Sequence, residues 1–169
     1  MGPKMRSTRP KIGTPIYTLT GAESGVIINH ARNRFAKHGG EVKLYIVGQN
    51  PSIKNWHAET PFWGSPSGVR LRRLLNYVGL GDTEYSLINA APNWYQRTPP
   101  PASAIDLPED IKTAAAICLG RVAEKYVLRS GCKHVICIPH PSPRNRAWNE
   151  RNAEHKAQYA IASFLRSIK

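Results

Sequence analysis

Short apolar runs alternate along the chain with longer segments of helical periodicity. The apolar runs are bounded by turn-forming residues, as is typical of strands, and they predict strands at residues 43–47, 85–89, 114–119 and 135–138. The helical segments begin with capping residues and carry apolar residues three or four positions apart. They predict helices at residues 20–37, from Ser65 to about Val78, from Gly120 to near Gly131, and from about Asn149 to Ile168.

This alternation predicts an α/β fold, a three-layer αβα sandwich with a central four-stranded parallel sheet. The strands are apolar on both faces, as expected when helices cover both sides of a parallel sheet. Residues 16–169 are expected to form a single domain. Residues 1–15 are basic and contain proline and glycine, so we expect them to form a flexible N-terminal arm.

In such sheets the ligand binds at the carboxyl ends of the strands. The expected strand ends lead into four segments that hold the unusual chemistry of the chain: Gly48-Gln-Asn-Pro-Ser52, Asn89-Ala-Ala-Pro-Asn93, Leu119-Gly-Arg121 and His140-Pro-Ser-Pro-Arg144.

The first and last of these segments each combine proline with polar side chains. Glycine and proline around Asn50 predict a rigid turn that could aim an amide at a ligand, although a plain strand-exit turn has the same pattern. Two prolines hold the backbone that presents His140, Ser142 and Arg144. Histidine can donate to a leaving group, serine can bind phosphate, and arginine can bind phosphate or enter a base stack. The alternative is a proline-rich loop with an ordinary surface histidine.

The net charge narrows the choice of partner. Lysine and arginine total 24 against 11 acidic residues, which gives +13 and favours a polyanionic partner such as a nucleic acid. A basic protein without any nucleic-acid role is the alternative. Membrane-surface binding is disfavoured because no basic amphipathic helix with a bulky apolar face is present. No apolar run approaches the ~20 residues of a membrane span, and no signal peptide is evident. We therefore expect a cytoplasmic, nucleoid-associated or nuclear protein that is not secreted.

Cysteine and histidine give no sign of a metal site. The three cysteines, Cys118, Cys132 and Cys137, cannot by themselves fill a four-cysteine site, and Cys118 and Cys137 lie in apolar runs typical of small core residues. The histidines other than His140 lack the spacing of metal ligands. We expect neither a metal nor an organic cofactor.

Taken together, Gly48-Gln-Asn-Pro51 and His140-Pro-Ser-Pro-Arg-Asn145 resemble the two signature motifs of the uracil-DNA glycosylase superfamily. The second motif is most similar to the single-strand-selective monofunctional branch, and the first is similar to that branch and the mismatch-specific one. The resemblance covers roughly residues 43–146. It implies that Asn50 positions a water and that His140 bonds uracil O2 as charge develops there.

The resemblance also implies roles for further residues. Gln49 would contact the base, Phe62 would stack on it, and Asn89 would read its O4 and N3–H edge. DNA would be bound by Ser52, Gly120, Ser142 and Arg144, with Arg144 filling the space left by the flipped base.

Three features depart from the family pattern. The best-known uracil enzymes have an aspartate at the position of Asn50 and a tyrosine at that of Ser52, which excludes 5-substituents. Serine at this position implies that 5-modified uracils are possible substrates. The iron–sulfur branches need four cysteines, which this chain lacks. Pro99-Pro-Pro101 follows the strand at 85–89, whereas the family's proline-rich phosphate loop precedes it, so this role is not assigned.

The sequence predicts a monofunctional DNA glycosylase that acts as a monomer on single- or double-stranded DNA. No lysine lies in the motifs to form a Schiff base with the sugar, so strand cleavage is not expected. A catalytically silent DNA-binding protein on the same fold is the leading alternative. A small-molecule α/β enzyme is disfavoured because the chain has neither a Gly-x-Gly-x-x-Gly motif nor a P-loop.

Overall fold

The sheet contains the four parallel strands that the sequence predicts. The computed structural model describes residues 18–19, 42–51, 64–93 and 99–168. The parallel strands are β2 (Leu44–Gly48), β3 (Ser86–Asn89), β4 (Ala115–Leu119) and β5 (His134–Ile138). A two-residue strand, β1 (Thr18–Leu19), pairs antiparallel with β3 and completes the order β1-β3-β2-β4-β5. The sequence did not predict β1, because two residues are too few to show a periodicity.

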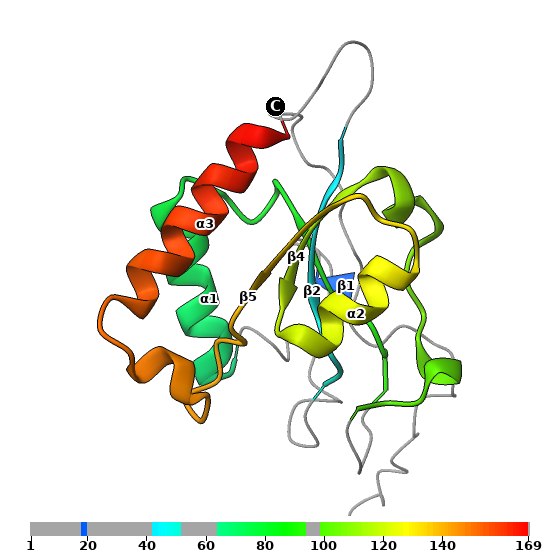
Figure 1. Cartoon of the computed structure of the whole chain (residues 1–169), viewed down its shortest axis with the longest axis horizontal. Coiled ribbons are helices and arrows are strands. Elements are labelled where there is room, and N and C mark those ends of the chain that lie inside the picture. Colours follow the sequence, from blue (N-terminus) through cyan, green and yellow to red (C-terminus); the bar gives the residue numbers. More distant parts are fainter. Residues whose placement is uncertain (1–17, 20–41, 52–63, 94–98, 169) are drawn as a thin grey trace, which may run out of the picture.

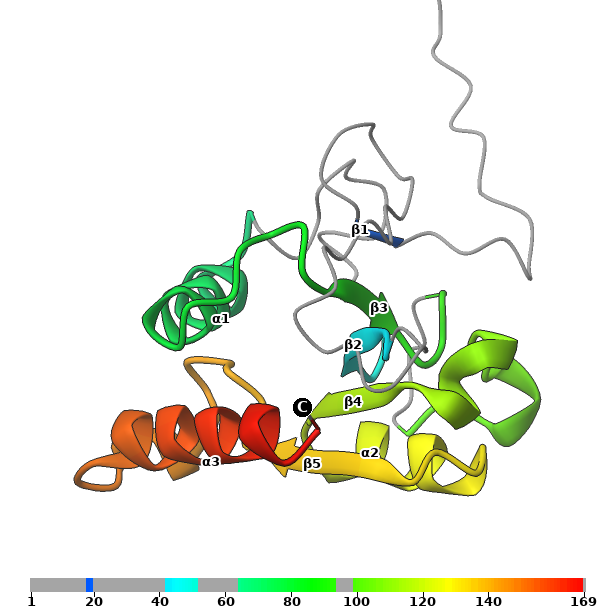
Figure 2. The same cartoon turned by 90° about the horizontal axis from the view of Figure 1, so that it is seen from above.

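Helices cover both faces of the sheet, which confirms the three-layer αβα sandwich. Figure 2 shows α1 (Pro66–Tyr77) and α3 (Ala153–Ser167) on one side and α2 (Arg121–Arg129) on the other. Three short 3-10 helices lie in the connections, η1 (Ala102–Ala104), η2 (Glu109–Thr113) and η3 (Arg146–Asn149).

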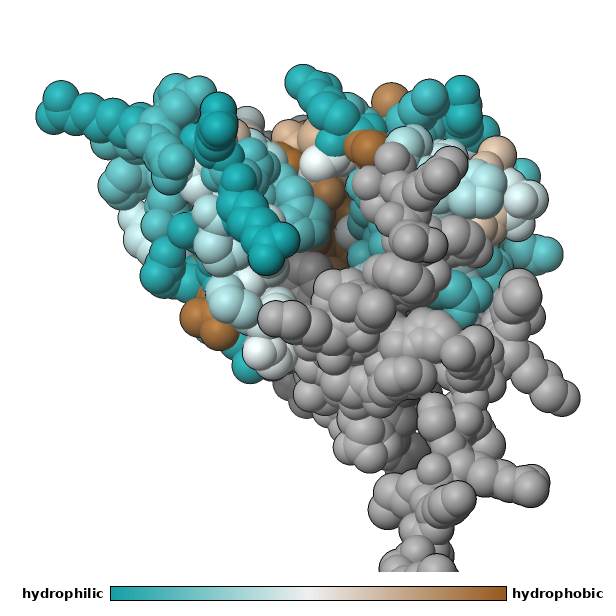
Figure 3. Space-filling model, turned by 90° about the horizontal axis from the view of Figure 1, so that it is seen from below, coloured by the Kyte–Doolittle hydropathy of each residue, from teal (hydrophilic) through white to brown (hydrophobic). Residues whose placement is uncertain are grey.

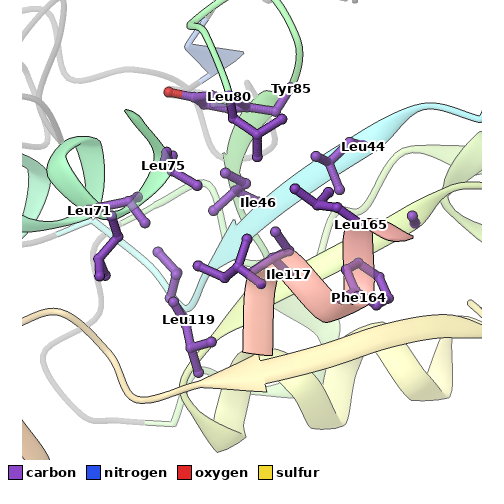
Figure 4. Close-up of a cluster of buried hydrophobic side chains, with 14 of the residues drawn as sticks. Leu44, Ile46, Leu71, Leu75, Leu80, Tyr85, Ile117, Leu119, Phe164 and Leu165 are labelled. Carbon is purple, nitrogen blue, oxygen red and sulfur yellow. The ribbon is translucent and has the colours of Figure 1, made fainter. Parts of the chain in front are cut away.

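Alternating strand residues build a separate core on each face. Leu44 and Ile46 of β2 pack with α1 and α3, whereas Tyr45 and Val47 pack on the α2 side. Both cores are apolar, so burial on two faces accounts for the nearly continuous apolar strands. Figure 4 shows the larger cluster, whose labelled residues come from β2, β4, α1, α3 and the α1–β3 connection: Leu44, Ile46, Leu71, Leu75, Leu80, Tyr85, Ile117, Leu119, Phe164 and Leu165.

The first residue of α1 agrees with the sequence prediction, whereas the first residue of α3 does not. Ser65 caps α1 by accepting a hydrogen bond from the Gly68 amide at 3.1 Å, with Pro66 at the first position, as predicted. The last helix begins at Ala153, not near Asn149. Asn152 has a left-handed φ of 65°, and this conformation separates α3 from the 3-10 turn η3 before it.

Some sequence predictions lie outside the described residues: the N-terminal arm at 1–15, the helix at 20–37, and the site residues Ser52 and Phe62. Of the cysteines, Cys118 is buried as expected and Cys132 is buried as well, whereas Cys137 is half-buried because β5 is the edge strand of the sheet. Among the described helices, none is long and apolar enough to cross a membrane.

Candidate active site at the carboxyl ends of the strands

The parallel strands end on the same edge of the sheet, at the bottom of Figure 1. Figure 3 views the molecule from this side and shows apolar residues between two hydrophilic regions. The described site residues follow these strand ends: Gln49 and Asn50 after β2, Asn89 at the end of β3, Gly120 after β4, and His140, Ser142 and Arg144 after β5. The topology therefore gathers these residues at one edge.

Gly48 and Asn89 are partners in the β2–β3 register. A Cβ atom at Gly48 would lie 2.4 Å from Asn89 Oδ1, a distance that real Cβ atoms do not show. Glycine at position 48 therefore makes room for the Asn89 amide. This amide is half-buried, and no other described residue uses its donor or its acceptor.

The turn after β2 is held by backbone hydrogen bonds to the segment after β3. The Ala90 and Ala91 amides donate to the carbonyls of Gly48 and Gln49 at 2.8 and 2.9 Å. Asn50 Nδ2 donates to the Pro51 carbonyl at 3.1 Å. This bond uses one of the two Nδ2 hydrogens of Asn50 and neither lone pair of Oδ1, so Oδ1 can still accept a hydrogen bond.

The hydrogen bonds of His140 select one tautomer of its ring. The Ser142 backbone N–H donates to His140 Nδ1 at 3.1 Å, so Nδ1 must carry a lone pair. In the neutral ring the proton is then on Nε2. His140 therefore presents an Nε2–H donor.

Burial lowers the pKa of His140 below its usual value of 6.5, and burial is the only cause of this shift. Protonation at Nδ1 would also direct a second donor at the Ser142 amide. Both effects favour the neutral ring near pH 7.

The loop after His140 is held by hydrogen bonds within the loop, one to a side chain and one between backbone groups. Ser142 Oγ accepts from the Arg144 amide at 3.2 Å, and the Ser142 carbonyl accepts from the Asn145 amide at 3.0 Å. No described residue accepts the Ser142 hydroxyl hydrogen. Arg144 is exposed and has no ion-pair partner in the described part of the chain. These groups could meet a phosphate without first breaking an internal contact.

Gly120, which follows β4, lies next to His140, which follows β5. It has φ 96°, and a Cβ added there would be 3.5 Å from the His140 Cβ. Its backbone N–H donates to the Ile138 carbonyl at 2.9 Å, so this group is not available to a DNA phosphate. A cavity of about 300 Å³ opens beside it, lined by Gly120, Arg121, Cys137, Ile138, Pro139, His140 and Asn145.

Two residues without an assigned role in the sequence analysis contact His140, and a third contacts one of these two. Asn145 Nδ2 and Trp148 Nε1 both donate to the His140 carbonyl, at 3.0 and 2.7 Å. The Arg70 guanidinium of α1 lies 5.1 Å from the centre of the Trp148 ring. Asn145 belongs to the second motif and could have been suspected. Arg70 and Trp148 are far apart in sequence, and no pattern links them.

Comparison with known proteins decides the family. The family description "Uracil DNA glycosylase superfamily" matches residues 36–162, which is most of the chain. The chain belongs to this superfamily. A solution structure from Methanosarcina acetivorans, described as a "putative Uracil DNA glycosylase", has the same fold with a TM-score of 0.53. It is 16% identical, and the alignment covers 73% of this chain and 91% of that one. No curated protein matches the chain.

As a member of the uracil DNA glycosylase superfamily, whose proteins act on DNA, the chain has a site composed of neutral donors and acceptors. An imidazole donor, the amides of Gln49, Asn50 and Asn89, and a hydroxyl gather at one edge, with an exposed arginine in the same loop as the imidazole. In the described part of the chain, no three histidine, cysteine or acidic side chains lie close enough together to hold a metal ion. Such a group of side chains can bind a base and stabilise an anion by hydrogen bonding.

Proposed function

We propose that the protein is a monofunctional DNA glycosylase that hydrolyses the N-glycosidic bond of uracil, of a 5-modified uracil or of another deaminated base in DNA. The observation that carries the proposal is the Ser142–His140 hydrogen bond, because it makes Nε2–H of a neutral histidine the available donor. Membership of the superfamily supports the reaction class.

In this reaction the bond between C1′ and the base nitrogen breaks, and its electron pair leaves with the base. The negative charge that develops on uracil is shared with O2. His140 Nε2–H donates to this oxygen, and a donor held in place before the reaction stabilises the transition state more than the ground state. A neutral histidine does this without transferring its proton.

Water then adds to C1′ and releases a proton to solvent, and the departing base anion takes up a proton, which leaves an abasic site and the neutral free base. Asn50 Oδ1 is the acceptor that holds this water, since Nδ2 is engaged by the Pro51 carbonyl. A placed water can contribute several powers of ten to the rate. No covalent sugar–enzyme bond forms in this scheme, so the DNA strand stays intact.

Recognition of the base is assigned to Asn89, with Gln49 and Phe62 as further contacts. The Asn89 amide, which no other described residue bonds, offers an acceptor to N3–H and a donor to O4 of uracil. Ser52 stands at the position of a tyrosine in the best-known uracil enzymes, and its smaller side chain supports 5-modified uracils as substrates.

Binding to DNA is assigned to Ser52, Ser142 and Arg144, and the net charge of +13 supports it. The role proposed for Gly120 is only to let DNA approach its backbone closely, because its N–H already donates to the Ile138 carbonyl. Motif similarity supports placing the chain near the single-strand-selective monofunctional and mismatch-specific branches.

The direct test is incubation with a uracil-containing oligonucleotide followed by hot alkali, which breaks the strand at abasic sites. We expect alkali-dependent cleavage at the uracil and an intact strand without alkali. A panel of 5-modified uracils and other deaminated bases would identify the preferred substrate. Binding without cleavage would instead support the catalytically silent DNA-binding protein. A protein that shows no binding and no cleavage would contradict both functions.

The pH dependence of base release should reflect His140. Its pKa lies below 6.5, so the neutral ring persists through pH 6.5, and the acidic decline of the single-turnover rate is expected below that value. The unfolded chain, with a histidine pKa of about 6.5, takes up the proton first. Stability is therefore fully present above about pH 6.5 and is lost as the pH falls toward the folded-state pKa. A decline of the rate centred at or above pH 6.5 in the folded protein would argue against this role.

A further inference from the structure

The carbonyl oxygen of His140 is the meeting point of two side chains. Trp148 Nε1 donates to it at 2.7 Å and Asn145 Nδ2 at 3.0 Å. On the other side of the residue, the Ser142 amide holds Nδ1. The backbone and the ring of His140 are thus held at separate points, which restricts the direction of the Nε2–H bond.

Trp148 is itself held from a different layer of the fold. Its half-buried ring packs against the core that α1 and α3 share. The Arg70 guanidinium, from α1, lies over the ring at 5.1 Å from its centre. Arg70 Nη1 is buried and has no hydrogen-bond partner in the described residues. The ring face is therefore the identified partner of this cation.

We propose that Arg70 and Trp148 are positioning residues for the glycosylase reaction, linking α1 to the His140 carbonyl. The proposal rests on the proposed function. Neither residue touches the reacting atoms. Trp148 fixes the His140 backbone through its indole N–H, and Arg70 fixes the ring of Trp148. Since α1 packs on α3 and the sheet, this contact ties the β5 edge loop to the rigid part of the fold.

The first test compares two arginines of the same helix. Arg70→Met removes the cation over Trp148 and keeps much of the side-chain volume. Arg73→Met removes the same charge from α1 and breaks the ion pair with Glu154 of α3, which is a different partner from Trp148. We expect kcat to fall about fivefold in R70M with KM unchanged, as for loss of a partly buried cation–π contact. R73M should keep the wild-type kcat, and Arg70→Lys should restore most of the loss.

The second test asks whether Arg70 acts through Trp148. Trp148→Phe keeps an aromatic ring but removes the N–H donor, and we expect kcat to fall about tenfold. In the R70M/W148F double variant the two losses should not multiply, because both variants release the same carbonyl. Losses that multiply fully, or equal rates for R70M and R73M, would overturn the proposal. Thermal unfolding of each variant identifies any that fails to fold, and R70M alone then decides.

The imidazole nitrogens give a readout that does not depend on turnover. In the ¹⁵N-histidine-labelled full chain, the Nδ1 and Nε2 shifts of His140, assigned with His140→Gln, report its tautomer. We expect R70M and W148F to move them toward a mixture of tautomers and R73M to leave them in place. If wild type releases no uracil, the proposed function fails, and these shifts still decide the positioning role. Unchanged shifts in R70M and W148F would overturn it.

Discussion

Replacing Asn50 by alanine is expected to slow base release about a hundredfold or more in a single turnover while DNA binding persists. The reason is that Asn50 Oδ1 is the acceptor assigned to the attacking water, whereas Asn50 carries no charge that would hold the DNA backbone. The measurement is the single-turnover rate on a uracil oligonucleotide, with affinity measured in parallel by fluorescence anisotropy.

Two further variants serve as controls for Asn50→Ala. Asn50→Asp supplies a charged acceptor, which holds water more strongly, so its rate should equal or exceed that of the wild type. Asn76→Ala removes the same kind of amide from the exposed surface of α1 and should have no effect. If folded N50A kept the wild-type rate, the water would have to be positioned by another residue.

Replacing Asn89 by aspartate is expected to lower the uracil rate about 10- to 100-fold and to create activity on cytosine. Uracil presents the O4 acceptor beside the N3–H donor, whereas cytosine presents an amine beside a bare N3. A buried mismatch costs about 1–3 kcal/mol for each unpaired polar group. An aspartate accepts from the cytosine amine and, when protonated, donates to N3. The measurement is alkali-dependent cleavage of uracil and cytosine oligonucleotides side by side.

Two controls separate recognition of the base from a general disturbance. Asn89→Ala should lose uracil activity without any gain on cytosine. Gly48→Ala should do the same with Asn89 intact, because the new Cβ would occupy the space of Asn89 Oδ1. Wild-type uracil rates in both N89D and N89A would show that the base is read elsewhere, and Asn93 would be the next candidate.

The sequence predicted those parts of the fold that depend on local patterns. The four parallel strands fall within a residue or so of their expected bounds, because burial on both faces requires apolar runs and turn residues close them. Ser65 and Pro66 marked the start of α1 for the same local reason. The start of α3 was missed because the left-handed Asn152 belongs to a tight connection that helical periodicity does not detect.

The features of the site likewise separate into those that local sequence predicts and those that depend on tertiary contacts. Residues at strand ends, such as Asn89 and His140, follow from the topology of a parallel sheet once the strands are known. The hydrogen bond from the Gly120 N–H to the Ile138 carbonyl depends on the pairing of β4 with β5. The Arg70–Trp148 contact depends on how α1 packs against η3. Both are tertiary contacts, and nothing in the neighbouring sequence specifies them.

The strand order also sets a length scale for the substrate. Asn89 ends β3 and His140 follows β5, with β2 and β4 between them. Neighbouring strands lie about 4.8 Å apart, so the two backbones are separated by about 14 Å across the sheet. A ring that bonds both side chains must bridge the part of this span that they do not reach. In the proposed reaction, the spacing of the strands thus limits the size of the base that can bond both side chains.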